Sequence, residues 1–161
     1  MGWNPEVTVA AVVSHDRKFL FVEELIGGKL VLNQPAGHLE PAETLIDAVI
    51  RETREETAWR FTPESLVGAY QWRSPQDGRG FLRFAFCGEV DDHHPRQALD
   101  QGIVRALWLT PDELGGQRER LRSPLVMRCV EDYLLGRRQP LDAVARLDLK
   151  SALEVPGVVN L

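Results

Sequence analysis

Residues 37–59 read GHLEPAETLIDAVIRETREETAW, a stretch that combines a glycine, an early glutamate and a dense group of charges. Pro41 and the pair at 43–44 favour a helix start, and apolar residues then recur at helical spacing. We therefore predict a helix from about residue 43 to about residue 57. The stripe expected to face the core consists of Ile46, Val49, Ile50, Thr53 and Thr57.

Three glutamates share one narrow face of this predicted helix. At about 100° per residue, Glu56 lies about 40° to one side of Glu52, and Glu55 about 60° to the other. Like charges at these spacings weaken an isolated helix by about 0.2–0.5 kcal/mol per pair, so the face requires compensating cations. Arg51 and Arg54 supply part of this compensation. Taken alone, the stretch is compatible with a solvated charged face or with a metal site.

The context upstream of the glutamates favours the metal site. Gly37 follows a predicted strand, and a glycine at that point allows a tight turn or a close backbone approach. Either arrangement would expose carbonyl groups near the start of the helix. An oxygen-rich site of this kind suits magnesium, with manganese as the alternative.

The spacing of these residues resembles the Nudix box. That motif is a glycine, five residues, a glutamate, seven residues, and then Arg-Glu-U-x-Glu-Glu-x-Gly-U, where U is bulky and apolar. Gly37, Glu43 and the run at 51–59 match every charged position. Thr53 is a weak apolar residue for its position, and Ala58 replaces the second glycine. Further stretches resemble the NudJ-type bacterial phosphatase branch of the family: VTVAAVV, LNQPAGHLEPAETL, QW at 71–72, FLRFAF at 81–86 and RSPLV at 122–126.

The resemblance implies a role for each charged residue of the box. Glu52 and Glu56 would be the principal metal ligands, and the main-chain carbonyl of Ala36 would be an additional one. Glu55 would be a ligand or the base that activates water. Arg51 would orient the glutamates by pairing with Glu43 or Glu55 and would not touch the substrate, which leaves Arg54 as solvated surface.

Outside the box, four residues are candidates for the site. Some members of the family draw a further acid from a loop before a late strand, and Asp100 is the best-placed residue for that role. Trp72 either stacks on a substrate ring or packs at the rim of the core. Arg83 interrupts an apolar strand and either binds a phosphate or carboxylate or snorkels at the sheet edge. His38 either contacts phosphate or caps a turn.

Two further polar groups have ordinary explanations. Asp91, Asp92, His93 and His94 are consecutive, and neighbours in sequence cannot readily converge on one ion, so we expect a polar loop. Arg122 and Ser123 precede the last predicted helix and could bind phosphate at its N-terminus, although Ser123 as an ordinary helix cap explains that residue equally well.

The remaining patterns predict a mixed α/β domain. Strands are expected from EVTVAAVVS, KFLFVEEL, KLVLNQ, SLVGAYQW, GFLRFAFCGEV and VRALWLT, and helices from PDEL and SPLVMRCVEDYLLG. Alternation within FLRFAF puts Leu82, Phe84 and Phe86 on one face, and Phe81, Arg83 and Ala85 on the other. With the resemblance, this predicts a Nudix-type α/β/α sandwich, a mixed sheet with the glutamate helix packed on it. We expect one domain over residues 1–161, with 139–161 as a poorly determined tail.

The composition argues against a protein that binds nucleic acid or membranes through its overall charge. The formal net charge of -5 offers no general attraction to nucleic acid or to anionic membranes. Neither a leader peptide nor a membrane-length apolar run is found in the sequence, so we expect a cytoplasmic protein.

Cys87 and Cys129 lack metal-ligand spacing and are expected to be buried reduced thiols. We also expect a monomer with a small-molecule diphosphate or triphosphate as its partner.

Three functions follow from these observations and from the resemblance. The first is magnesium-dependent hydrolysis of nucleoside tri- and diphosphates and of hydroxymethylpyrimidine diphosphate, with release of orthophosphate. The second is a pyrophosphatase acting on nucleoside diphosphate sugars or dinucleotides. The third is a ligand-sensing Nudix module without turnover, because a fold does not guarantee chemistry.

Overall fold

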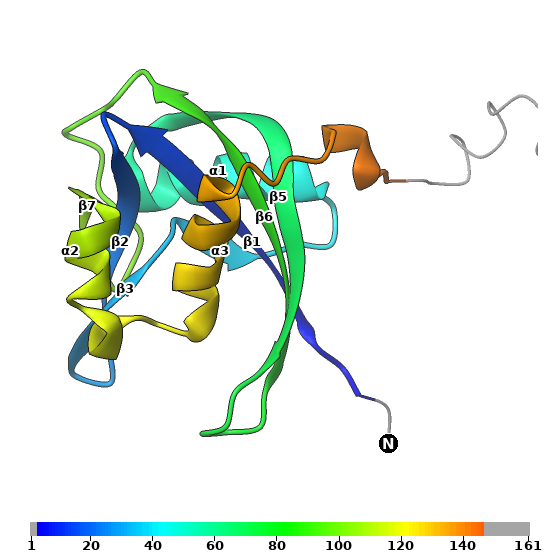
Figure 1. Cartoon of the computed structure of the whole chain (residues 1–161). Coiled ribbons are helices and arrows are strands. Elements are labelled where there is room, and N and C mark those ends of the chain that lie inside the picture. Colours follow the sequence, from blue (N-terminus) through cyan, green and yellow to red (C-terminus); the bar gives the residue numbers. More distant parts are fainter. Residues whose placement is uncertain (1–2, 147–161) are drawn as a thin grey trace, which may run out of the picture.

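A seven-stranded mixed sheet lies at the centre of the computed structural model, which describes residues 3–146 (Figure 1). The strands follow the order β3-β2-β1-β6-β5, with β4 paired to β1 and β7 paired to β2. Their bounds are β1 Glu6–His15, β2 Lys18–Ile26, β3 Lys29–Asn33, β4 Ala36–His38, β5 Arg60–Arg73, β6 Gly80–Asp91 and β7 Ile103–Leu109.

The parallel pair of β1 and β6 makes the sheet mixed. Their register runs from Glu6 opposite Phe81 to Val13 opposite Gly88. The other pairs are antiparallel, including the long hairpin of β5 and β6. Parallel strands must be joined by a long connection. The connection from β1 to β6 contains α1 and β5.

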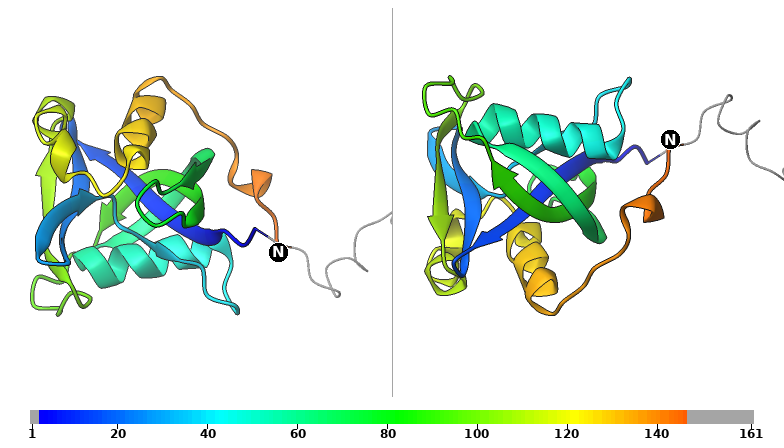
Figure 2. Two further views of the ribbon diagram at one scale, coloured as in Figure 1. Left: turned by 90° about the horizontal axis from the view of Figure 1, so that it is seen from below. Right: turned by 90° about the horizontal axis from the view of Figure 1, so that it is seen from above.

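Helices cover both faces of the sheet, as the view from below in Figure 2 shows. The glutamate helix α1 (Leu45–Thr57) packs on one face, and α3 (Pro124–Leu134) packs on the other. The short helix α2 (Pro111–Gly115) contacts α3 and β7. The predicted α/β/α sandwich is therefore confirmed.

Alternation along the central strands divides the core into two layers. In β1, Val9 and Ala11 pack in the layer that contains Val49 of α1, whereas Ala10 packs in the layer that contains Val126 of α3. The predicted alternation in β6 agrees, because the side chains of Phe84 and Phe86 lie in the α1 layer and that of Ala85 lies in the α3 layer. Cys87 and Cys129 are both buried free thiols, as predicted.

Local capping determines where α1 begins and ends. Thr44 accepts a hydrogen bond from the Asp47 N–H, and the Asp47 side chain accepts one from the Thr44 N–H. This capping box starts the helix at Leu45, slightly later than predicted. At the other end, Ala58 takes the left-handed conformation that favours glycine, with φ of 60° and ψ of 13°. Alanine therefore occupies the cap in spite of its conformational cost.

Two strand features differ from the prediction. The short strand β4 around Gly37 was not predicted, and it pairs with β1. Strand β5 begins at Arg60, before the predicted start near residue 65, and its register shifts after Pro63 and after Leu66. A proline within a strand is tolerated at such a bulge, so the early segment remains part of the sheet.

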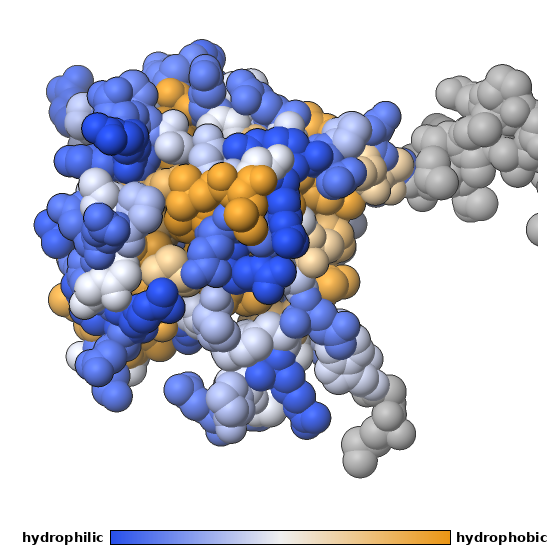
Figure 3. Space-filling view, viewed as in Figure 1, coloured by the Kyte–Doolittle hydropathy of each residue, from blue (hydrophilic) through white to orange (hydrophobic). Residues whose placement is uncertain are grey.

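The described part of the predicted tail pairs with the edge strand β5 and continues to the α1 layer, where Leu141 and Val144 pack. The backbone of Gln139 exchanges two hydrogen bonds with Leu66 of β5, at 2.8 Å each, and a 3-10 turn follows at Leu141–Ala143. Figure 3 shows an apolar patch over the end of α3, where Leu134 and Leu135 are exposed. No helix within residues 3–146 is long and apolar enough to cross a membrane. Residues 147–161, the rest of the tail, lie outside the described residues.

We predict that Ala58→Gly stabilises the protein by about 0.5–1 kcal/mol. Removing Cβ relieves the left-handed strain of about 1–2 kcal/mol, and the extra flexibility of glycine in the unfolded chain offsets part of that gain. The measurement is the free energy of unfolding in urea. The control is Ala48→Gly within α1, which should destabilise by about 1 kcal/mol or more. A loss of stability in Ala58→Gly would show that the cap is not strained.

Candidate functional site

The Arg51 guanidinium connects the acidic residues of α1 to the segment before the helix. Two of its nitrogens donate to the Glu43 carboxylate at 2.7 and 2.9 Å, and Nη1 donates to Glu52 at 2.8 Å and to Glu55 at 3.1 Å. Nη2 also donates to the His38 carbonyl oxygen at 3.0 Å. These bonds lower the pKa of Glu43 and raise that of Arg51. Arg51 thus pairs with both partners that the family resemblance implied, Glu43 and Glu55, and also with Glu52.

Gly37 brings β4 into direct contact with Glu52. A Cβ built on Gly37 would lie 2.0 Å from the carboxyl carbon of Glu52, so the end of the Glu52 side chain or β4 itself would have to shift. Gly37 has no positive φ, so the need for glycine is the close approach and not a turn. Strand β4 can therefore lie against the acidic face of α1.

Glu56 is the most deeply buried carboxylate of the group. Its Oε2 accepts a hydrogen bond from the Ala36 N–H at 2.9 Å. Burial raises its pKa to about 9, and the nearby negative charges of Glu52, Glu24 and Asp100 add to this effect. Burial also raises the pKa of Glu52, against the lowering effect of its bond to Arg51. Crowded carboxylates of this kind destabilise the protein unless a cation binds them or some of them take up protons.

Two acids from other elements join the helix glutamates around one cavity. Asp100 lines it, and the Asp100 N–H donates to the Glu55 carbonyl oxygen at 2.9 Å. Glu24 of β2 also lines it, and burial raises the pKa of Glu24. The sequence analysis missed Glu24. The available signal was the EE pair in β2, where a register shift separates Glu24 from Glu23, which instead binds Arg105 and Arg120.

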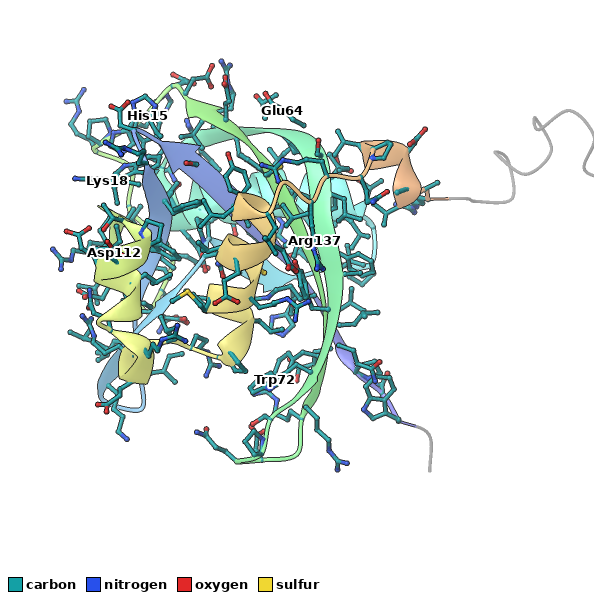
Figure 4. The ribbon with its side chains drawn as sticks, in the orientation of Figure 1. His15, Lys18, Glu64, Trp72, Asp112 and Arg137 are labelled. Atoms are coloured by element: carbon teal, nitrogen blue, oxygen red, sulfur yellow. The ribbon has the colours of Figure 1, made fainter. Side chains whose placement is uncertain are left out.

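The cavity, of about 740 Å³, extends from these carboxylates to the end of the β5–β6 hairpin. There Trp72 stacks on Phe81 with ring centroids 5.5 Å apart and planes 24° apart, and Figure 4 shows Trp72 near the hairpin end. Both alternatives for Trp72 have support, because the ring packs on a neighbour and also lines the cavity. The cavity reaches the first turn of α3 as well, at residues 123–127.

Arg83 is buried in the interior of the sheet and lines the same cavity. Its strand β6 lies between β1 and β5, so the interpretation as a snorkelling arginine at a sheet edge is wrong. His38 lines the cavity too, but its Nε2 lies 2.6 Å from a Glu6 carboxylate oxygen and its side chain is largely exposed. A phosphate contact by His38 stays a prediction.

The loop after β6 is fastened to the end of α1 by Arg54. Nη1 of Arg54 donates to the carbonyl oxygens of Ala58 at 3.2 Å and Asp92 at 2.9 Å, and Nη2 lies 2.6 Å from His94 Nδ1. The interpretation of Arg54 as solvated surface is therefore wrong. His93 stacks on Trp59, with centroids 4.3 Å apart, so the DDHH segment has a structural role.

The chemistry of the donors fits a hard divalent cation. Four acidic residues, Glu24, Glu52, Glu56 and Asp100, line this end of the cavity, and magnesium and manganese prefer such oxygen ligands. Within residues 3–146, no group of three His, Cys, Asp or Glu side chains is already arranged around a metal position. Glu52 and Glu55 are bonded to Arg51, and Glu56 to Ala36, so a cation would compete with these bonds.

Comparisons with known proteins agree with the geometry. Residues 4–128 match the NUDIX domain family. The phosphatases NudJ of Escherichia coli O1:K1 and of Shigella flexneri are both 44% identical over 142 residues, which cover 88% of this chain and 92% of each relative. A NUDIX hydrolase structure from Nitrosomonas europaea is 49% identical, with a TM-score of 0.88 over 91% of this chain and 99% of that one. A UDP-X diphosphatase structure shares the fold at 20% identity, with a TM-score of 0.69 over 85% of this chain and 66% of that one.

We predict that Gly37→Ala lowers the free energy of unfolding by about 1–3 kcal/mol, because the new methyl group displaces the Glu52 carboxylate or moves β4. Urea denaturation measures the change. Gly115→Ala is the matched control, since a Cβ there meets nothing within 4 Å and the φ of Gly115 is not positive. Equal stability of the two variants would contradict the close packing of β4 on α1.

Proposed function

The chain belongs to the Nudix family of hydrolases, and we propose that it cleaves the terminal phosphoanhydride bond of its substrates with the help of magnesium. The proposed substrates are nucleoside tri- and diphosphates and hydroxymethylpyrimidine diphosphate. Orthophosphate is the proposed product, in keeping with the relatives that are named phosphatases.

The observation that carries this proposal is the group of acids around Glu56. Glu24, Glu52, Glu56 and Asp100 line one cavity, and Glu56 is buried to 8% exposure. Burying several carboxylates together is costly unless a cation binds them or some of them take up protons, and a divalent cation would displace those protons. Arg51 neutralises the outer part of the group and leaves Glu56 without a cationic partner within the described residues.

We assign the ligands on the basis of these positions and of the family resemblance. Glu52 and Glu56 would bind magnesium, or manganese in its place, together with the main-chain carbonyl of Ala36. Glu55 is 44% exposed and would serve as a further ligand or as the base for water, and Asp100 as an additional acid. When bound, the cation would supply charge neutralisation of the phosphate oxygens and a lower pKa for attacking water.

The proposed reaction is a hydrolysis. The oxygen of water forms a bond to the terminal phosphorus while the bond from that phosphorus to the bridging oxygen breaks. The bridging oxygen leaves with the electron pair and stays on the shortened product. A carboxylate of the α1 face takes the proton of the attacking water and later releases it to solvent.

Arg51 would position the glutamates, and an aromatic pair would recognise the ring of the substrate. Arg51 holds Glu52 and Glu55 in place. The stacked pair of Trp72 and Phe81 offers an aromatic wall for the base or pyrimidine ring of a substrate. Aromatic stacking tolerates different rings, which agrees with a broad range of substrates.

We predict magnesium-dependent release of orthophosphate from a panel of phosphoanhydrides, measured colorimetrically. Glu56→Gln keeps the size of the side chain but loses its charge, so kcat/KM should fall by about 100-fold or more. The control is Glu64→Gln, since Glu64 is exposed and lies toward the other end of β5 from Trp72 (Figure 4). Equal activity of Glu56→Gln and the wild type would refute the ligand assignment.

We also predict that the products locate the cleaved bond. A nucleoside triphosphate should give the diphosphate and orthophosphate, as separated by anion-exchange chromatography. Release of a nucleoside monophosphate and a sugar phosphate from a nucleoside diphosphate sugar, without orthophosphate from any substrate, would favour the pyrophosphatase. Absence of any metal-dependent turnover across the panel would favour a ligand-sensing module.

A further inference from the structure

We propose that Arg83, Arg122 and the first turn of α3 form an anion subsite that holds the terminal phosphate of the substrate. The inference rests on the proposed function, since it assigns the group that would be released as orthophosphate. Arg83 lies in β6, whereas Arg122 directly precedes α3, and all three parts line the cavity that also contains Glu52 and Glu56. The subsite would therefore lie within reach of the same bound substrate.

The first observation is the buried charge of Arg83. The residue is 6% exposed, and within residues 3–146 its guanidinium donates to two neutral amide oxygens, Gln34 Oε1 at 3.2 Å and Asn33 Oδ1 at 3.3 Å. No carboxylate pairs with it there, and its Nε has no hydrogen-bond partner. The nearby Cys129 thiol is neutral, because burial raises its pKa to about 11.

A buried cation without an anionic partner is costly, and an unused donor adds to that cost. Thr8 lies directly opposite Arg83 across β1 and β6, and its Oγ1 is also buried without a partner in the described structure. Thr8 and Arg83 both line the cavity. The two orphan groups thus lie side by side where an anionic acceptor from the substrate would satisfy them.

The second observation is the start of α3. Ser123 occupies the cap position, as predicted, but its side chain makes no capping hydrogen bond. The first N–H groups of a helix lack partners within it and attract anions. Pro124 has no N–H, and the Val126 N–H donates to the Ser123 carbonyl oxygen at 3.2 Å. Ser123 and Leu125 line the cavity, so the Ser123 hydroxyl and the Leu125 N–H are the donors offered to a ligand.

The third observation is that the start of α3 is held in place. The Arg122 N–H donates to the Leu32 carbonyl oxygen at 2.8 Å, which fixes the chain just before the helix. Gln34 Nε2 donates to the Val126 carbonyl oxygen at 2.7 Å, while its Oε1 accepts from Arg83. Gln34 therefore connects the buried arginine to the first turn of α3, and the parts of the subsite are positioned before a ligand arrives.

The charge and the number of donors favour a terminal phosphate. A terminal phosphate carries up to two negative charges and three free oxygens, whereas an inner phosphate carries one charge and two free oxygens. The subsite offers two arginines, the Ser123 hydroxyl and the Leu125 N–H, which match the larger set. A nucleobase or a sugar would leave the charge of Arg83 unpaired.

The test is calorimetric titration of the full-length protein with inorganic phosphate, in EDTA, so that no turnover is needed. Arg122→Gln should weaken binding by about tenfold, since a hydrogen-bonded charge is lost from an exposed position where folding is safe. Arg83→Lys keeps the charge but loses the fork of donors and should weaken binding similarly. Ser123→Ala should weaken it by about threefold.

The control is Arg60→Gln, because Arg60 is exposed, pairs with Asp91 and does not line the cavity. Its phosphate affinity should equal that of the wild type. The inference is overturned if Arg122→Gln and Arg83→Lys bind phosphate as the wild type does while both remain folded by circular dichroism. That result would leave the proposed hydrolysis untouched, and an inactive protein that still binds phosphate through these residues would count against the hydrolysis alone.

Kinetics with a nucleoside triphosphate distinguish a substrate phosphate from a free effector phosphate. Added orthophosphate should raise KM without changing kcat, and Arg122→Gln should weaken this inhibition by about tenfold. Inhibition that lowers kcat at constant KM would place phosphate outside the substrate position and overturn the inference.

Discussion

The guanidinium of Arg51 is the interaction on which the acidic site depends. It donates to Glu43, Glu52, Glu55 and the His38 carbonyl oxygen, and so ties α1 to the segment that leads into it. Because Arg51 compensates the outer carboxylates, the helix can carry several like charges on one face without unfolding its last turns. Gly37 then lets β4 approach this face, and the Ala36 N–H meets the buried Glu56. Arg51 does not reach Glu56, so the buried Glu56 carboxyl remains without a cationic partner within the described residues and lines the cavity.

The cavity combines two opposite electrostatic requirements. At one end, carboxylates from α1, β2 and the loop before β7 lie close together, and a bound cation would stabilise them. Elsewhere, Arg83 is buried with neutral partners, and a bound anion would stabilise its charge. A metal–phosphate substrate would satisfy both at once, which agrees with a hydrolase of phosphoanhydrides. The hydrophobic layers on either side of β1 and β6 hold the carboxylates and Arg83 at fixed positions relative to one another.

Much of this arrangement could be predicted, and the rest depended on long-range contacts. The shared face of Glu52 and Glu56 and the i,i+4 pair of Arg51 and Glu55 follow from helix geometry, which is local, whereas the pairing of Arg51 with Glu43 was implied by the family resemblance. Capping also explains why α1 begins after Thr44. By contrast, Glu24 reaches the site only because β2 lies beside β1 and β7, and no nearby motif marks it. Arg54 binds Asp92 and His94, which lie far along the chain, and the parallel pairing of β1 with β6 joins segments that local patterns cannot connect.

Anomalous scattering from a crystal soaked in manganese tests the central claim most directly, because it locates the cation without relying on activity. The account predicts an anomalous peak bounded by the carboxylates of Glu52 and Glu56 and the carbonyl oxygen of Ala36, and loss of that peak in Glu56→Gln. A peak elsewhere in the cavity with none at these oxygens, or an unchanged peak in the variant, would contradict the assignment of the glutamate face as the metal site.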